Sequence, residues 1–225
     1  MNSSRLIQFQ AQVADSERKG VIAGVQQLFN CLHEVAGDII WRAEVRFDPP
    51  MQPMSPMPGA SVIMLSLLPD VDLLDEPIDA TEARRHAQLQ PLLETGVPVF
   101  LRTVFRHVPD YWRDATGALR LERIRRLNRM AADLSLAYGL GVIDIDRAFT
   151  HIGGDVLRTD LRLQGNVATE VAGHTMAWSL LSFGLDDVID PAIQESARAA
   201  LGNIHQIDNL LLSRLAPQQA EAAAG

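Results

Sequence analysis

Residues 119–146, which read LRLERIRRLNRMAADLSLAYGLGVIDID, contain the change of pattern that decides the fold. In the first part, apolar residues recur every three or four positions, as they do on one face of an amphipathic helix. After Gly139 the apolar run of residues 141–146 has the length of a buried strand. A helix followed at once by a short apolar strand is typical of α/β proteins with a parallel sheet.

The same alternation of strands and helices extends toward the N-terminus. Residues 6–13 alternate between apolar and polar side chains, which predicts a half-buried strand. The helical spacing that follows the turn at Asp15 and Ser16 predicts a helix up to Gly37. Residues 38–47 alternate again and carry charges on one face, which favours an edge strand protected from stray pairing.

The continuous apolar run of residues 61–68 and the buried-type segment of residues 97–105 predict central strands that are covered on both faces. Between them we expect a helix that is capped by Asp79, kinked at Pro91 and ended by Gly96. The arginines that follow in residues 119–138 could bind an anion, but their interleaving with acidic residues favours a solvated helix face.

The proline-rich segment 48–59 separates two predicted strands. Its five prolines cannot donate the hydrogen bonds of a helix or sheet, so we expect an extended loop inside one domain. Met51, Met54 and Met57 could form an adaptable contact surface there, or a lid packed on the core.

The C-terminal third predicts two more helices. Asn166 is expected to cap a helix that ends at Gly184, and Asp190 with Pro191 begins a final helix. We therefore expect an α/β domain over residues 1–184, a helical extension over 185–216 and a disordered tail over 217–225.

Composition excludes several classes of function. The formal net charge of −8 leaves no basic surface for nucleic acid or anionic membranes. The single cysteine, Cys31, excludes an intrachain disulfide and is expected to be a small buried hydrophobe. We find no metal-ligand spacing and no phosphate-binding glycine loop, and we expect no cofactor. The absence of a secretory signal or membrane span predicts a cytoplasmic protein.

Ligands of parallel sheets bind beyond the carboxyl ends of the strands. Arg102, Arg106 and His107 come at the end of one predicted central strand, so they could hold an anionic or hydroxylated ligand. Ordinary solvation of this rim is the alternative.

The order of these segments resembles that of the SGNH (GDSL-type) hydrolases. The resemblance rests on an Asp-Ser turn after the first strand, followed by VIMLSLL, GVPVFLRT, LNRMAADLSLAYG, VIDID and TDLRL. It covers roughly residues 5–183. It implies a three-layer α/β/α sandwich with a five-stranded parallel sheet in the flavodoxin-like order 2-1-3-4-5, to which the C-terminal helix is added.

The resemblance also implies a catalytic serine and aspartate. Members of the family have a Gly-Asp-Ser turn and an Asp-x-x-His pair, in which the histidine takes the serine proton and the aspartate orients the imidazole. Ser16 matches the nucleophile, and Asp160 matches the acid. Asp15, Arg102 and His107 are the candidate binding residues. The alternatives are that Asp15 or Ser16 caps a helix and that Asp160 forms a structural salt bridge.

Several positions depart from the family pattern. Leu163 stands where the family has its histidine, and Ala14 replaces the glycine of the serine turn. Asp70 and Asp72 lie in the loop that carries the oxyanion asparagine in the family, and Gly59 alone is near the place of the oxyanion glycine.

These matches and departures lead to two hypotheses. The first is an SGNH-like protein that has lost ester hydrolysis and acts as a binding or protein-interaction module, with the C-terminal helix contacting a protein partner or a second copy. The second is an active serine ester hydrolase or acyltransferase on a small acyl ester, such as an O-acylated carbohydrate, with His151 or His174 as a relocated base. A different flavodoxin-like protein is a third possibility, which another strand order would favour.

Overall fold

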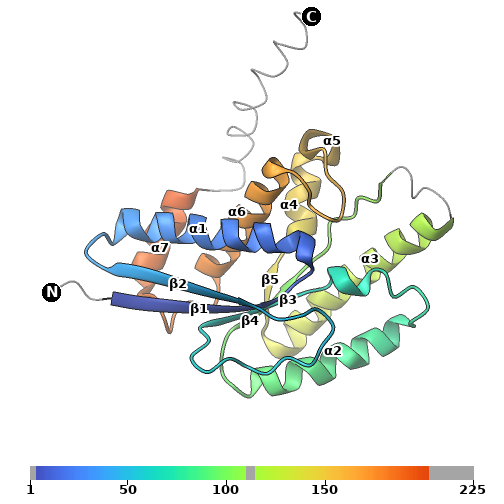
Figure 1. Cartoon of the computed structure of the whole chain (residues 1–225), viewed down its shortest axis with the longest axis horizontal. Helices are drawn as coiled ribbons and strands as arrows, with labels where there is room; N and C mark the ends of the chain where they lie inside the picture. The colour runs from blue at the N-terminus through green and yellow to red at the C-terminus, as the bar shows by residue number, and fades with distance from the viewer. Residues whose placement is uncertain (1–3, 110–114, 203–225) are drawn as a thin grey trace, which may run out of the picture.

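The computed structural model describes residues 4–109 and 115–202, and its centre is a sheet of five parallel strands in the order β2-β1-β3-β4-β5 (Figure 1). The strands are β1 (Ser4–Gln12), β2 (Ile40–Phe47), β3 (Val62–Ser66), β4 (Val99–Arg102) and β5 (Gly141–Ile143). Every neighbouring pair runs in parallel. The predicted strand order and the edge position of β2 are therefore confirmed.

Helices cover both faces of the sheet. Figure 1 shows α1 (Arg18–Val35) and α6 (Asn166–Ser182) above the sheet, with α2 (Ile78–Leu93) and α3 (Ala115–Tyr138) below it. α7 (Pro191–Leu201) packs against α1 and α6. Four short helices follow strand ends or lie in the loop before α6, namely η1 (Asp15–Glu17), η2 (Leu68–Asp70), α4 (Ile145–Ile152) and α5 (Gly154–Leu157). The arrangement is the predicted three-layer α/β/α sandwich.

The central strands supply both halves of the core. In β3, Val62 and Met64 pack under α1 and α6, whereas Ile63 and Leu65 pack on the α2 and α3 side. All four are buried, and each such side chain contributes about 1.5–3 kcal/mol on burial. Cys31 is buried in α1, as predicted, and burial raises the pKa of its thiol.

α1 and α6 cross at a pair of glycines. A Cβ atom on Gly173 would lie 2.7 Å from the backbone nitrogen of Gly24, and one on Gly24 would lie 2.9 Å from the Gly173 carbonyl oxygen. No real Cβ tolerates such distances without displacement of its neighbours. The close approach of the two helices therefore requires glycine on both.

Several predicted boundaries are wrong. β5 ends at Ile143 and not at residue 146, because the Asp144 carboxylate accepts a hydrogen bond from the Arg147 N–H and begins α4. Asp79 does not cap α2, which begins one residue earlier, at Ile78. The cap of α6 is Gly165, and Asn166 is the first helical residue.

The glutamine face of β1 is more deeply buried than predicted, because residues 48–59 fold over it. The Gln12 amide donates to the carbonyl oxygens of Pro49 and Gln52, at 2.8 Å each. The Gln10 amide donates to the Ser55 carbonyl at 2.8 Å. Because the proline-rich loop does not pair with a strand, these carbonyl oxygens have no backbone N–H partner in the sheet. The glutamine amides donate to them instead. The segment is therefore a loop held on one domain, as expected.

Two surface predictions for α3 and the methionine loop are only partly correct. Arg125, Arg126 and Arg129 are exposed, but Arg123 is buried and donates to the carbonyl oxygens of Asp70 and Glu76. Arg123 is buried because these two bonds anchor η2 and the start of α2. Within the methionine loop, Met54 is buried in the core, whereas Met51 is exposed.

The final helix begins as predicted. The Asp190 carboxylate accepts from the Ala192 N–H at 2.9 Å, and Pro191 is the first helical residue. Ala197 belongs to the core shared with α1 and α6. α7 ends at Leu201, where Gly202 has a φ of 78°. The predicted continuation of this helix and the predicted tail after residue 216 lie outside the described residues.

None of the helices that the structure describes combines the length and the apolar composition needed to cross a membrane.

Candidate functional site at the carboxyl edge of the sheet

Ser16 lies in η1, directly after β1, and its side chain is exposed. Its hydroxyl makes no hydrogen bond to any residue in the part of the chain that the structure describes. Neither Asp15 nor Ser16 caps α1 through its side chain. Asp15 is exposed and forms an ion pair with Arg18 at 2.8 Å. The turn therefore presents an exposed hydroxyl at the carboxyl edge of the sheet, with no partner among the described residues.

A buried ion pair lies next to this turn. The Glu17 carboxylate accepts from the Ala14 N–H at 2.9 Å, and its other oxygen lies 3.3 Å from Nε of Arg102. Arg102 is 0% exposed and Glu17 is 2% exposed. Arg102 lies on the same face of β4 as Phe100, near α1, where a Cβ added to Gly20 would lie 3.9 Å from its Nη2. The structure thus places Arg102 inside the core and not on the solvent-exposed rim.

Both terminal nitrogens of Arg102 lack a hydrogen-bond partner among the described residues. A buried guanidinium without its full set of acceptors carries a desolvation cost. Glu17 is its counter-charge, and the sequence pattern did not single out Glu17. The available signal was the strand alternation of FLR, which directs Arg102 to the same face as Phe100.

Asp160 lies in the loop before α6 and is bound by Arg162. One carboxylate oxygen accepts from the Arg162 N–H at 2.8 Å and from its Nε at 3.0 Å. Burial alone would raise the pKa of Asp160, but the hydrogen bonds from Arg162 outweigh burial, and the nearby charge of His107 adds to them. The pKa of Asp160 is therefore below its ordinary value, and the group is a firmly ionised partner of Arg162.

Leu163 occupies the family's histidine position and points into the core. It is buried with the apolar residues beneath α1 and α6. Its φ is 55°, a left-handed conformation that is uncommon for leucine, and its N–H donates to the Asp160 carbonyl at 2.9 Å. This tight turn directs position 163 away from the rim.

The three histidines weighed from the sequence lie in different settings. His107 stacks on Phe105 with ring centres 5.6 Å apart, and its carbonyl accepts from the Leu161 N–H at 2.9 Å. His174 is buried in α6, where burial lowers the pKa of its ring. His151 is exposed near the end of α4. The charge of His107 lowers the pKa of Asp160, but no described histidine is hydrogen-bonded to Ser16.

The two aspartates of the predicted oxyanion loop are already paired. Asp70 is fully buried, and its carboxylate binds Arg84 at 2.7 Å and Nε of Arg85 at 2.9 Å. Asp72 pairs with Arg120 at 3.0 Å. Gly59 lies beside Gln8, where an added Cβ would be 2.6 Å from the Gln8 amide oxygen. Because β1 rises about 3.3 Å per residue, Gln8 is roughly 13 Å before the end of the strand, so Gly59 is not beside Ser16.

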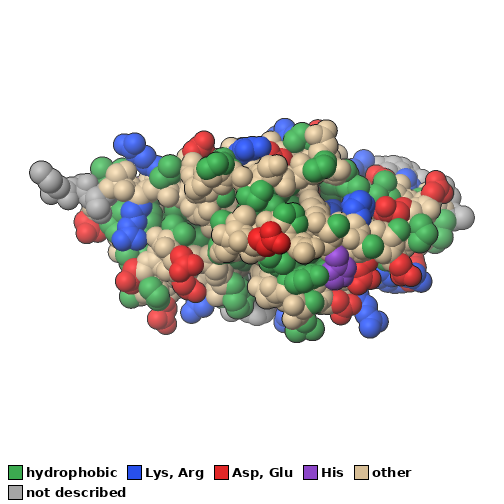
Figure 2. All heavy atoms as spheres, turned by 90° about the horizontal axis from the view of Figure 1, so that it is seen from below, with side chains coloured by type: hydrophobic (Ala, Val, Ile, Leu, Met, Phe, Trp, Pro, Cys, Tyr) green, Lys and Arg blue, Asp and Glu red, His purple; other side chains and the backbone are tan. Residues whose placement is uncertain are grey.

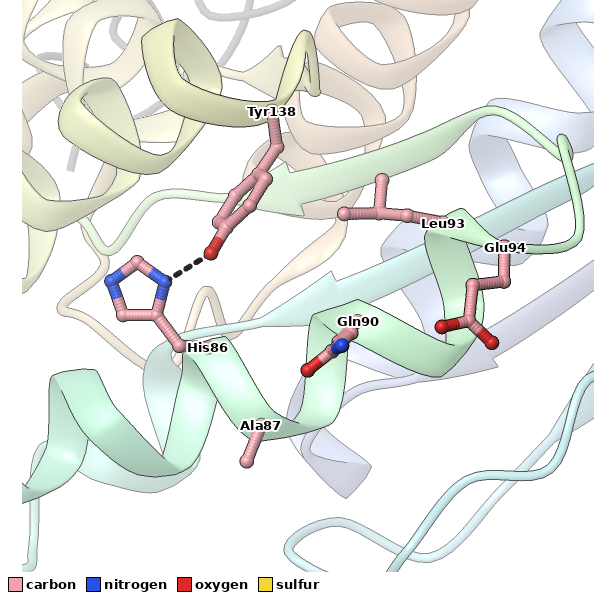
Figure 3. Close-up of a pocket in the computed structure, with 6 residues that line it drawn as sticks. All are labelled: His86, Ala87, Gln90, Leu93, Glu94 and Tyr138. Carbon is pink, nitrogen blue, oxygen red and sulfur yellow. Dashed lines mark hydrogen bonds between the residues drawn. The ribbon is translucent and has the colours of Figure 1, made fainter.

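We describe three hollows that described residues line. One, of about 880 Å3, is a groove between α4 and α6 that includes Arg106, His151, His174 and Trp178. A second, about 720 Å3, lies between α2 and α3 (Figure 3), where the Nδ1 atom of His86 is 2.6 Å from the Tyr138 hydroxyl. The third, about 300 Å3, lies between residues 51–54 and α2. Neither Ser16 nor Asp160 lines any of these three.

Figure 2 views the molecule from the side of α2 and α3, where acidic, basic and hydrophobic side chains are interspersed. Among the described residues, no group of three or more His, Cys, Asp or Glu side chains is arranged to hold a metal ion. The described part of the chain therefore offers polar and apolar hollows, but no metal centre.

No protein-family model matches the chain, and no curated protein matches it. Solved structures do resemble it. A GDSL-like lipase of Parabacteroides merdae superposes with a TM-score of 0.57 at 11% identity, covering 80% of this chain and 96% of that one. LAE5, an α/β hydrolase from the metagenome of Lake Arreo, gives 0.54 at 13% identity, with 90% and 99% covered.

A catalytic mutant of an acetylxylan esterase from Geobacillus stearothermophilus gives a TM-score of 0.52 at 15% identity, with 81% and 94% covered. Identities this low show the fold alone. The strand order, the helical layers and these neighbours agree, and the chain therefore has the fold of the SGNH hydrolases.

Proposed function

We propose that this protein is an SGNH-type scaffold that does not hydrolyse esters through Ser16 and that acts as a binding or protein-interaction module. The observation that carries the proposal is the turn from Asp160 to Leu163. The position of the family's base holds a buried leucine, and the carboxylate that would orient the base is bound to Arg162.

The chemistry explains why this turn matters. A serine hydroxyl is a weak nucleophile until a base removes its proton, and such proton transfer typically contributes about 10²–10⁴-fold in rate. Ser16 makes no hydrogen bond to a histidine within the described ranges. Asp70, at the place of the oxyanion loop, is turned into a buried cluster of ion pairs. Base and oxyanion donors are both missing from their family positions.

A binding role uses what the scaffold retains. The rim keeps an exposed Ser16 and Asp15, which can hydrogen-bond a small acylated or hydroxylated ligand. The face of α7 that is turned away from α1 and α6 would be the surface for a protein partner or for self-association.

A second candidate function is hydrolysis or transfer of a small acyl group, such as that of an O-acylated carbohydrate. The link between the His107 loop and the Asp160 turn favours it, since the His107 carbonyl accepts from the Leu161 N–H at 2.9 Å and a carboxylate near an imidazole can orient a catalytic base. The structural likeness to an acetylxylan esterase agrees with this substrate class.

The rate of hydrolysis of a chromogenic acetate ester distinguishes the binding module from the hydrolase. We expect the wild type, Ser16→Ala and His107→Ala to give the same rate as a matched control, Ser196→Ala, whose serine is exposed on α7. Labelling by a fluorophosphonate probe should also be absent. A wild-type rate that falls at least about 100-fold in Ser16→Ala, but not in Ser196→Ala, would establish the hydrolase and reject the first proposal.

A further inference from the structure

The outer edge of β2 has no partner strand among the described residues. β2 is the first strand in the order of the sheet, and there it pairs with β1 alone (Figure 1). The Asp48 N–H, directly after β2, donates to the Ala11 carbonyl of β1 at 2.9 Å. Because backbone groups alternate in direction along a strand, the even-numbered residues of β2 direct their N–H and C=O groups toward β1. The groups that point outward along the free edge therefore belong to the odd-numbered residues, Trp41, Ala43, Val45 and Phe47.

The face of β2 that is turned away from α1 carries charges of alternating sign. Arg42, Glu44 and Arg46 lie on this face, and all three are exposed. Glu44 accepts from the Gln8 amide at 2.8 Å, and Arg46 pairs with Asp48 at the same distance. Arg42 forms no ion pair in the part of the chain that the structure describes. The edge strand therefore presents an unpaired cation beside an exposed carboxylate.

A second copy of the same strand matches this edge when it runs antiparallel. A two-fold axis on Ala43 places Arg42 of each copy opposite Glu44 of the other. These are non-hydrogen-bonded positions, where facing side chains lie closest. An axis on Arg42 or Glu44 would place like charges opposite each other, and an axis on Val45 would extend the ladder onto Pro49, which has no N–H. The charges that protect the edge from stray pairing therefore permit pairing in this one register.

Apolar side chains flank the edge on both faces of the sheet. The Arg18 guanidinium of α1 lies over the Phe47 ring, 5.3 Å from its centre, so this flank of α1 lies above the edge. Ile22, one helical turn further along this flank, is 52% exposed. On the opposite face, Ile40 is 44% exposed and would lie opposite Arg46 of the second copy, whose aliphatic stem would cover it.

We propose that the protein forms a two-fold dimer in which β2 of each copy pairs antiparallel about Ala43. The contact joins two five-stranded sheets into one. Each hydrogen-bonded pair of residues exchanges two bonds, so the ladder between Trp41 and Val45 would contain about six. The inference does not depend on whether Ser16 hydrolyses esters, and it uses a surface other than α7.

Sedimentation velocity of the full chain tests this proposal. We expect a mass of about twice 24.7 kDa at tens of micromolar. Arg42→Glu and Glu44→Arg each place like charges opposite each other and should raise the dissociation constant at least about tenfold. The double variant restores opposite charges and should return the constant to within about threefold of the wild type. Arg129→Glu reverses the same charge at an exposed site on α3 and is the matched control, which should leave the constant unchanged.

Ala43→Pro removes the outward N–H at the axis, leaves the bonds from β2 to β1 in place and should give a monomer. Circular dichroism verifies the fold of each variant, and the charge reversals, which lie at exposed positions, carry the test even where proline disturbs β2. A monomeric wild type would overturn the proposal. So would a dimer that is insensitive to both single reversals, or a double variant that does not recover, because the contact would then lie on another surface or in another register.

Discussion

Replacing Glu17 by glutamine should destabilise the protein strongly, because it leaves the Arg102 guanidinium buried without a counter-charge. Glutamine keeps the size of the side chain and can still accept from the Ala14 N–H, so the change isolates the charge. Arg102 is 0% exposed and already lacks partners for its two terminal nitrogens. Removal of one member of a buried pair costs about 3–5 kcal/mol of unfolding free energy.

Urea denaturation followed by circular dichroism gives the free energy of unfolding directly. Arg102→Met should cost a similar amount, since it strands the Glu17 carboxylate. The double variant Glu17→Gln with Arg102→Met should lie within about 1 kcal/mol of the wild type, because no unpaired charge remains. The exposed pair supplies the control, and Asp15→Asn should cost less than about 1 kcal/mol. Additive losses in the double variant, or a loss below about 1 kcal/mol for Glu17→Gln, would refute the reasoning.

Three further predictions follow from contacts in the two helical layers and the Asp160 turn. Gly173→Ala should cost about 1–3 kcal/mol of unfolding free energy in urea, because the added methyl meets the Gly24 backbone. The His174 pKa is lowered on folding, so the native state binds fewer protons than the unfolded state, and stability should fall as the pH drops below about 6.5. His174→Gln should flatten that dependence in denaturation measured from pH 7 to 5. The Asp160 pKa is also lowered, so its contribution is present above the unfolded value near 3.8 and lost as the pH falls through the folded value. Asp160→Asn should therefore lower stability at pH 7 by about 1–2 kcal/mol through its contact with Arg162, while leaving the ester hydrolysis rate unchanged.

Periodicity predicted the order and layers of the fold because each strand and helix has its own local pattern. The apolar run of residues 61–68 predicted β3, and the alternation of residues 38–47 predicted the edge strand β2. The end of β5 was misplaced because Ile145 continues the apolar run while already belonging to α4. At such a boundary, the capping bond from Asp144 decides, and apolar content does not reveal it.

The local sequence pattern could not predict which side chains a distant segment of the chain would bury. Gln10 and Gln12 alternate with apolar residues as solvent-facing side chains do, yet residues 48–59 bury them. The burial of Arg102 could not be predicted either, because its counter-charge is Glu17, a residue 85 positions away in the sequence. The pattern within one segment cannot name the distant segment that will lie on it.

The resemblance to the SGNH hydrolases located the candidate site, and the contacts in the structure changed how its residues are interpreted. The positions of Ser16 and Asp160, after β1 and before α6, follow the family's order. The partnership of Asp160 with Arg162, two residues away, was readable as a local acid–base pair. The hydrogen bond from the Leu161 N–H to the His107 carbonyl depends on the packing of the loop after β4, which no local pattern specifies.

The left-handed turn at Leu163 has a consequence for engineering. A histidine introduced at this position alone would replace a buried apolar side chain and direct its imidazole into the core beneath α1. To turn the scaffold into a serine hydrolase, a designer would have to invert the turn, fill the space that Leu163 vacates and release Asp160 from Arg162 at the same time. Ester hydrolysis through a residue at position 163 is thus several coordinated changes away from this sequence.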